Sequence, residues 1–423
     1  MMKDPLVLGI DLGTSGVRVS IIDGCSELLQ TESAPYLKGL SNPFDWRDRC
    51  CSLIGRLKSS YRKRLRAIAV DGTSGTLLAC NPQGHPLAEA LPYSFACPDR
   101  IEQLREFLPQ GGPASSASGS LGRALHLLKQ HSEPLLLRHQ ADWISGWLLE
   151  DWSCGEEGNN IRLGWDLRTG TWPESFVSQP WWSALPEIRA SGSVLGTLSP
   201  QRSKDLDLPE DLLVVAGTTD SNAAVLTADA GDDEGITVLG STLVLKRFTQ
   251  QPIAAGAGTS THRVGGRWLC GGASNAGAAV LKQIFPDIDI AELSRQIDPD
   301  QCSGLQLLPL PKRGERFPVD DPELEPVLTP RPVSDALYLH GLLEGLTRIE
   351  AAGWQCLTTL GADPPRRIVT LGGGARNPQW RRLRERHLGV PIRSCNTPPA
   401  AGVARLALAA LIAPDKKDHL REN

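Results

Sequence analysis

The chain has 423 residues, which is too long for a single hydrophobic core and is typical of two domains. Its 40% hydrophobic and 22% charged residues are ordinary for a soluble globular protein, and its net charge of −4 at pH 7 gives no basic field for binding nucleic acid. The ten cysteines show neither Cys-x-x-Cys pairs nor zinc-ligand spacing, and we see neither a signal peptide nor an apolar run long enough to span a membrane, so we expect a cytoplasmic protein with reduced thiols.

The first predicted element is a β-hairpin. Two apolar runs, residues 6–10 and 17–22, flank the turn Asp-Leu-Gly-Thr-Ser-Gly at 11–16. The turn places the carboxylate of Asp11 beside two hydroxyls and a glycine backbone, which are the groups that hold a magnesium-bound nucleotide. The hydroxyl and backbone groups belong to Gly13, Thr14 and Ser15. Asp-x-Gly-Thr is also an ordinary hairpin turn, so the motif alone leaves both interpretations open.

Two later strands also end in polar residues. After a helix expected from Pro43 to about Leu65, a buried strand leads into Asp71-Gly-Thr-Ser-Gly-Thr76. Because substrates bind at the carboxyl ends of parallel strands, we expect Asp71, Thr73 and Ser74 to line a cleft, although a capped turn would have the same residues.

The next such strand covers residues 212–219 and is followed by Asp220. The carboxylate of Asp220 could serve as a base for a hydroxyl, or it could simply cap the helix that follows.

The second half of the chain opens like the first. Residues 235–246 again give an apolar strand, a Gly-Ser-Thr turn and a second apolar strand. This repetition predicts two similarly built domains, each with a phosphate-binding hairpin facing one cleft. The turn residues are Gly240, Ser241 and Thr242. No acidic residue leads this second turn, which is tolerable because one metal needs one such carboxylate.

A glycine triplet follows the last long helix, which is expected from Ser334 to Leu360. The strand at 368–371 runs into three glycines, 372–374, before a helix that opens at Asn377-Pro378. Glycines let a flat base approach the backbone closely; Asn377 could hydrogen-bond a purine edge and Trp380 could stack on it. A plain turn that opens the helix is the alternative.

Taken together, the segments 9–18, 71–78, 217–224 and 371–380 resemble those of the FGGY carbohydrate kinases, of the actin, sugar kinase and Hsp70 superfamily. The resemblance implies an α/β fold with two actin-like (ribonuclease H-like) domains and a central cleft. It implies an N-terminal sugar-binding domain at 1–227, completed by a C-terminal helix at about 402–423, and a C-terminal ATP-binding domain at 228–401.

The resemblance also implies roles for individual residues. Asp220 accepts the proton of the sugar hydroxyl, Asp11 orients Mg²⁺ and contacts the sugar, and Ser74 binds the sugar. The residues expected to bind ATP are Gly13, Thr14, Ser15, Gly240, Ser241, Thr242, Gly373, Gly374, Asn377 and Trp380. Closure of the domains would exclude water, so that sugar and not water receives the phosphoryl group.

We therefore expect a kinase that moves the γ-phosphate of ATP to the primary hydroxyl of a ketopentose, acting as a monomer or homodimer. The compact motifs are similar to those of D-ribulose kinases of cyanobacteria and plants, which favours D-ribulose, with D-xylulose as the alternative. Two readings from other classes stay open: an ATPase of the actin or Hsp70 kind, and a sugar sensor without catalysis.

Overall fold

A computed structural model describes residues 5–109, 111–131 and 133–412. The chain divides into two compact units. Unit 1 comprises the described residues of 1–227, 263–266 and 398–423, and unit 2 comprises 228–262 and 267–397. Each unit contains a six-stranded mixed sheet with helices, so the expected α/β fold with two domains is confirmed.

Unit 1 is built on a sheet with the strand order β3-β2-β1-β4-β10-β9. The strands are β1 (Leu6–Leu12), β2 (Gly16–Ile22), β3 (Leu28–Pro35), β4 (Leu65–Gly72), β9 (Val194–Thr197) and β10 (Leu213–Thr219). The first two form the predicted hairpin, which is closed by a hydrogen bond of 2.9 Å from the Gly13 N–H to the Gly16 carbonyl. β1, β4 and β10 run parallel at the centre, and every residue of β1 is buried, which is why this strand reads as an apolar run.

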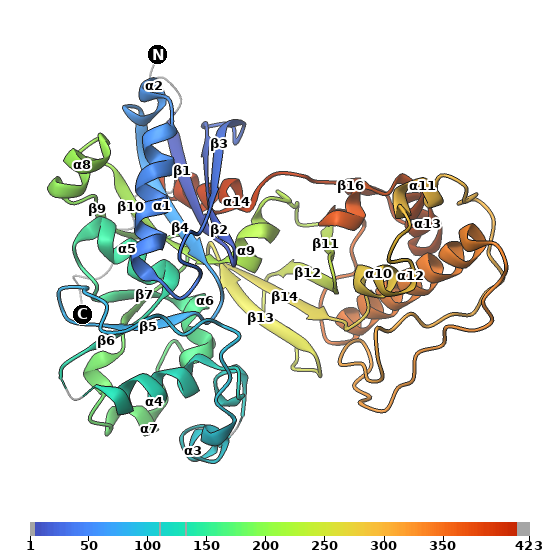
Figure 1. Cartoon of the computed structure of the whole chain (residues 1–423), viewed down its shortest axis with the longest axis horizontal. Coiled ribbons are helices and arrows are strands. Elements are labelled where there is room, and N and C mark those ends of the chain that lie inside the picture. The colour runs from blue at the N-terminus through green and yellow to red at the C-terminus, as the bar shows by residue number, and fades with distance from the viewer. Residues whose placement is uncertain (1–4, 110, 132, 413–423) are drawn as a thin grey trace. The chain divides into compact units, whose positions relative to one another are not determined.

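Helices cover both faces of this sheet (Figure 1). α1 (Pro43–Arg56) and α5 (Gln140–Leu149) lie on one face, and α9 (Asp220–Leu226) and α14 (Pro399–Ile412) lie on the other. α1 is shorter than predicted: its last residue is followed by an extended Leu57, and the short α2 (Ser59–Arg62) precedes β4.

α14, the last helix of the chain, packs on the first strand of unit 1. A Cβ added at Gly9 would lie 1.8 Å from the Ala400 carbonyl oxygen, and one at Gly402 would lie 2.0 Å from the Ala223 carbonyl oxygen. Both positions therefore need glycine, because the backbones of α14, β1 and α9 approach so closely.

The remainder of unit 1 consists of short elements. Its helices are α3 (Ile101–Phe107), α4 (Ser120–Gln130), α6 (Glu157–Asn160), α7 (Glu174–Val177) and α8 (Pro200–Leu206), with 3₁₀ turns η1 (Pro98–Arg100), η2 (Pro113–Ser115), η3 (Ile161–Leu163) and η4 (Trp182–Ala184). Two small sheets pair β5 (Leu77–Cys80) with β6 (Leu136–His139) and β7 (Cys154–Glu156) with β8 (Glu187–Arg189).

Unit 2 has the strand order β13-β14-β12-β11-β15-β16. The strands are β11 (Glu234–Leu239), β12 (Leu243–Thr249), β13 (Thr259–Val264), β14 (Arg267–Ala273), β15 (Arg367–Leu371) and β16 (Ile392–Ser394). Its helices are α10 (Ala278–Ile284), α11 (Ile290–Ser294), α12 (Asp335–Thr359) and α13 (Pro378–Leu388), with the 3₁₀ turn η5 (Gly373–Arg376).

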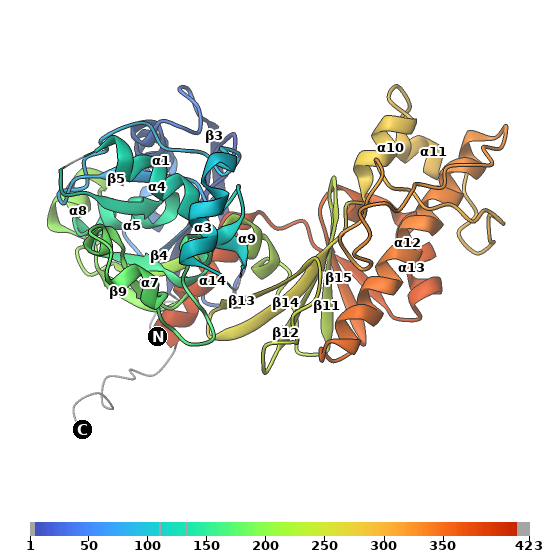
Figure 2. The same ribbon diagram turned by 90° about the horizontal axis from the view of Figure 1, so that it is seen from below.

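α12 and α13 lie side by side against this second sheet (Figure 2). Ser334 caps α12 as predicted, accepting a hydrogen bond from the Leu337 N–H. A buried ion pair of 2.6 Å joins Arg384 of α13 to Glu350 of α12, and Glu350 also accepts a hydrogen bond of 2.6 Å from Thr237 of β11. Because the charged pair is fully hydrogen-bonded, it fixes both helices against the strands.

Candidate active site

Three acidic residues meet at the carboxyl edge of the sheet in unit 1. Asp11, the last but one residue of β1, pairs in register with Asp71 of β4, and Asp71 pairs with Thr218 of β10. Asp220 is the first residue after β10, at the start of α9. Three parallel neighbours therefore bring together carboxylates that are far apart in the sequence, as the strand-end argument predicts.

Asp11 and Asp71 are in different surroundings. Asp11 is buried and makes an ion pair of 2.7 Å with the half-exposed Arg18 on the neighbouring strand. Asp71 is fully buried, and neither of its carboxyl oxygens has a hydrogen-bond partner among the described residues. Burial raises the pKa of both groups; the Arg18 charge counteracts the rise at Asp11, whereas the charges of Asp11 and Asp220 add to it at Asp71.

Asp220 does not cap the helix that follows it. The cap is Thr219, whose hydroxyl accepts the Asn222 N–H, and the Asp220 carboxylate accepts the N–H of Ser221 at 2.7 Å. Burial is the main reason that the pKa of Asp220 rises to about 6, opposed by backbone N–H donors at Ser221 and Ser74. A carboxylate with this pKa is mostly ionised at pH 7 and still basic enough to take a proton.

The loop after β4 divides its polar residues between two tasks. Ser74 is partly exposed beside Asp220. Thr73, which we expected to line the cleft, is buried instead: its hydroxyl lies 2.7 Å from Gln140 and 2.6 Å from Thr76. Gln140 donates in turn to the Tyr36 hydroxyl at 3.2 Å, so Thr73 belongs to a network that holds the loop in place.

Arg162, which sequence reasoning missed, lies beside this site. Its Cδ would be 3.2 Å from a Cβ added at Gly75, and its charge lowers the pKa of Asp220. Among the described residues it forms no ion pair, and its hydrogen bond to the Ser118 carbonyl, at 3.5 Å, is at the limit of length. A partly buried guanidinium that lacks a close partner is available to a ligand, but one arginine after an Asn-rich turn gave no signal in the sequence.

The turn between β1 and β2 presents hydroxyls to solvent. Thr14 and Ser15 are exposed, Gly13 is half-buried, and the Gly13 N–H is already used within the turn. The side chains at the tip are therefore the free donors of this hairpin.

A cavity of about 500 Å³ in unit 2 collects most of the residues predicted to bind ATP. Its walls are the β11–β12 turn, α10, α11 and the glycine triplet. From the predicted set it includes Gly240, Ser241, Gly373, Gly374, Asn377 and Trp380, whereas Thr242 does not line it. The remaining lining is Leu239, Ala278, Leu281, Lys282, Ile290, Ala291 and Arg376. The lining is mainly apolar, with two positively charged side chains, Lys282 and Arg376, and with glycine backbone. Such a cavity suits a flat base joined to an anionic group.

Two side chains at this cavity are used differently from our expectation. The Asn377 amide caps α13 by accepting the Trp380 N–H at 3.0 Å, and it donates to Ser294 at 2.8 Å. Trp380 is only 1% exposed, and its indole N–H donates to Thr347 at 3.2 Å. The Trp380 ring therefore packs against the Gly374 backbone, and it has no free face for stacking on a purine.

Residues 235–411 match the sequence model of the FGGY family of carbohydrate kinases, C-terminal domain. A xylulose kinase from Streptomyces rubiginosus is 24% identical over 456 residues, covering 96% of this chain and 87% of the relative. The C-terminal part of the chain therefore matches a family of carbohydrate kinases, and nearly the whole chain is similar to a xylulose kinase.

Solved structures of sugar and glycerol kinases share the fold of this chain. A xylulose kinase from Rhodospirillum rubrum aligns with a TM-score of 0.81 at 20% identity, covering 97% of this chain and 90% of that one. Plasmodium falciparum glycerol kinase with ADP aligns with the same TM-score at 17% identity over the same shares of the two chains. The expected closeness to D-ribulose kinases is not supported by these relatives, so it stays a prediction.

No helix in the described ranges combines the length and hydropathy needed to cross a bilayer. Within those same ranges, no group of three or more His, Cys, Asp or Glu side chains is arranged to hold a metal ion by itself.

Proposed function

We propose that this protein is a kinase of the FGGY family that transfers the γ-phosphate of ATP to the primary hydroxyl of a ketopentose. The observation that carries the proposal is the position of Asp220: a carboxylate of pKa about 6 next to the partly exposed Ser74, at the edge where β1, β4 and β10 end. In this role Asp220 accepts the proton of the attacking hydroxyl, and Ser74 holds the sugar beside it. Phosphoryl transfer asks for little more than positioning, charge neutralisation and such a base.

Asp11 would hold Mg²⁺ together with water and the nucleotide phosphates. The residues fit the ion, because the neighbouring Asp71 carboxyl is buried without a hydrogen-bond partner and Mg²⁺ usually takes only one or two protein carboxylates. Bound Mg²⁺ supplies neutralisation of phosphate charge. Arg18 orients the Asp11 carboxyl through their ion pair of 2.7 Å, and its charge opposes the rise in the pKa of Asp11 that burial causes.

The cavity of unit 2 is our candidate for the adenosine site. Gly373 is open, since a Cβ added there would meet nothing within 4 Å, and its backbone can lie flat against a base. Lys282 and Arg376 line the same cavity and carry the charge that phosphates need. Gly13, Thr14 and Ser15 on one hairpin and Gly240, Ser241 and Thr242 on the other would contact the phosphate chain.

Among ketopentoses, we propose D-xylulose as the first candidate substrate and D-ribulose as the second. The relative from S. rubiginosus and the protein from R. rubrum are both named xylulose kinases. D-ribulose remains the second candidate, because the Asp-Gly-Thr-Ser-Gly segment at 71–75 resembles that of the compact D-ribulose kinases.

The test is ADP release with Mg-ATP against D-xylulose, L-xylulose, D-ribulose, L-ribulose, glycerol and gluconate. We expect one ketopentose to stimulate ADP release strongly and to become phosphorylated. A slow rate that is indifferent to all six sugars would contradict the proposal and favour an ATPase or a sugar sensor.

The Asp220→Asn protein separates catalysis from binding. Loss of a general base costs roughly 10²- to 10⁴-fold in kcat. We expect a loss of this size with sugar binding changed only a few-fold, measured by the same assay and by equilibrium dialysis of the sugar. Full activity of this variant would overturn the role of Asp220.

A further inference from the structure

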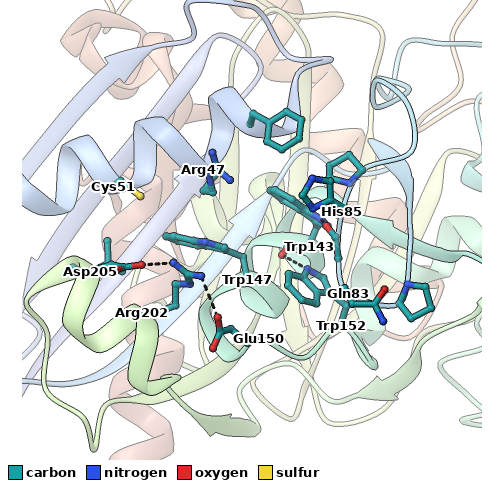
Figure 3. A pocket seen from close by; sticks show the side chains of 15 residues that line it. Arg47, Cys51, Gln83, His85, Trp143, Trp147, Glu150, Trp152, Arg202 and Asp205 are labelled. Carbon is teal, nitrogen blue, oxygen red and sulfur yellow. Dashed lines mark hydrogen bonds and ion pairs between the residues drawn. The ribbon is translucent and has the colours of Figure 1, made fainter.

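Unit 1 contains a second cavity, of about 580 Å³, with no residue in common with the carboxylate site (Figure 3). It is lined by residues of α1, α5 and α8 and by residues 82–86 of the loop that follows β5. Gln140, the first residue of α5, bonds to Thr73 near the carboxylates. The cavity is lined instead by Trp143 and Trp147 of that helix and by Glu150 just after its end. The volume falls in the range of roughly 300–1,000 Å³ that is usual for small-molecule sites.

Aromatic rings form the walls of this cavity, and they are held rigidly. A Cβ added at Gly84 or at Gly146 would lie 2.1 or 2.3 Å from the Trp152 ring, so this ring fits tightly against both glycines. The Trp152 indole donates to the Trp143 carbonyl at 3.1 Å, and the Trp143 indole donates to the Gly84 carbonyl at 2.9 Å. These walls are therefore preformed, and binding of a ligand would cost little conformational entropy of the side chains.

The charged side chains of the lining balance one another. Arg202 forms ion pairs with Glu150, at 3.1 Å, and with Asp205, and its guanidinium lies 5.5 Å from the centre of the Trp147 ring (Figure 3). Arg47 lies over Phe44 at 5.3 Å. Arg47 is paired with Asp48 at 3.0 Å, and Glu150 and Asp205 share Arg202, so a phosphate would find no arginine in the lining without a carboxylate partner.

We propose that this cavity binds a neutral saccharide. A saccharide has apolar C–H faces and a rim of hydroxyls that both donate and accept hydrogen bonds. The cavity offers the matching arrangement: the partly exposed ring of Trp152 for the apolar face, and donors and acceptors for the hydroxyls at Arg47, Gln83 and Glu150. The inference is independent of the proposed kinase reaction, since it uses none of the residues assigned to that reaction.

The experiment measures binding of D-glucose and maltose to the full chain by equilibrium dialysis, with tryptophan fluorescence as a second readout. Adenosine and tetramethylammonium serve as probes of a flat aromatic ligand and of a cation. We expect glucose or maltose to bind saturably, and we expect no binding of adenosine or tetramethylammonium. Since Asp220→Asn should also keep most sugar binding at the carboxylate site, a variant of the second cavity itself decides which site the saccharide occupies.

The variant of the site is the double substitution Arg47→Ala with Gln83→Ala. Gln83 is exposed and Arg47 is half-buried, with its ion pair to Asp48 on the surface, so we expect the melting temperature to change little and saccharide affinity to fall about tenfold or more. Arg66→Ala, which removes an exposed arginine of unit 1, is the matched control and should bind as the wild type does. Absence of saccharide binding, equal binding by the double variant, or preference for adenosine or tetramethylammonium would each overturn the proposal.

Discussion

The Asp220 carboxyl group owes its raised pKa to burial, so the activity should depend on pH in a defined way. A proton acceptor must be ionised, and below its pKa of about 6 the ionised fraction falls tenfold per pH unit. We expect kcat/KM to be level above about pH 7 and to decline towards pH 5 with a slope approaching one. Circular dichroism at each pH would show that the fold persists. A profile that is flat down to pH 5 would contradict the role of Asp220.

Arg162 should tune that same pH profile. Its positive charge lowers the pKa of Asp220, so Arg162→Gln should raise this pKa and move the acid limb to higher pH. If the guanidinium also contacts the sugar, the KM for sugar should rise about tenfold while the KM for ATP is unchanged.

The Arg162→Lys protein keeps the charge and should show the smaller pKa shift. Arg105→Gln removes an exposed arginine of α3 and serves as the control. An unshifted acid limb in Arg162→Gln would show that Arg162 has only a structural role.

At the scale of elements, the glycine triplet before α13 shows both the strength and the limit of sequence reasoning. Three glycines after a strand predicted an open backbone, and Gly373 is indeed open. The sequence could not show that Ser294 and Thr347, far away along the chain, take the hydrogen bonds of Asn377 and Trp380. Which partner satisfies a polar side chain depends on the tertiary packing, and a local motif does not contain that information.

The openness of Gly373 gives a test of the adenosine site. Gly373→Val adds atoms where nothing lies within 4 Å, so the fold should be kept while the cavity is narrowed. We expect the KM for ATP to rise about tenfold or more, equal to roughly 1.4 kcal/mol, with the melting temperature unchanged.

Gly374→Val is the informative contrast. A Cβ at Gly374 would lie 2.7 Å from Leu239 and 2.8 Å from the Trp380 ring, so this variant should lose stability, by about 1–3 kcal/mol, as overpacked sites do. An unaltered KM for ATP in Gly373→Val would remove the triplet from the nucleotide site.

At the scale of the whole molecule, the main architecture could be predicted because it depends on repeated local patterns. The hairpins at 6–22 and 235–246 and the buried parallel strands are encoded by apolar runs between turn residues. The aromatic cavity of unit 1 had no such signature. Trp143 and Trp147 are far along the chain from Arg202 and Asp205, and only the packing of α1, α5 and α8 brings these residues around one space.

The last prediction concerns the covering of β1 by α14, a helix from the opposite end of the sequence. Val403, Ala404 and Ala407 of that helix are fully buried, and Gly9 of β1 leaves room for its backbone. A fragment of residues 1–227 lacks α14 and would expose this apolar face of the sheet to water. We expect this fragment to aggregate or to unfold without a cooperative thermal transition.

Joining residues 398–412 to the fragment through a flexible linker should restore a cooperative transition in circular dichroism, because α14 can then cover β1. Replacing Gly9 by Ala in the joined fragment should abolish this rescue, since the added Cβ would clash with the Ala400 carbonyl at 1.8 Å. If residues 1–227 alone melt as cooperatively as the joined fragment, α14 does not complete the core of unit 1.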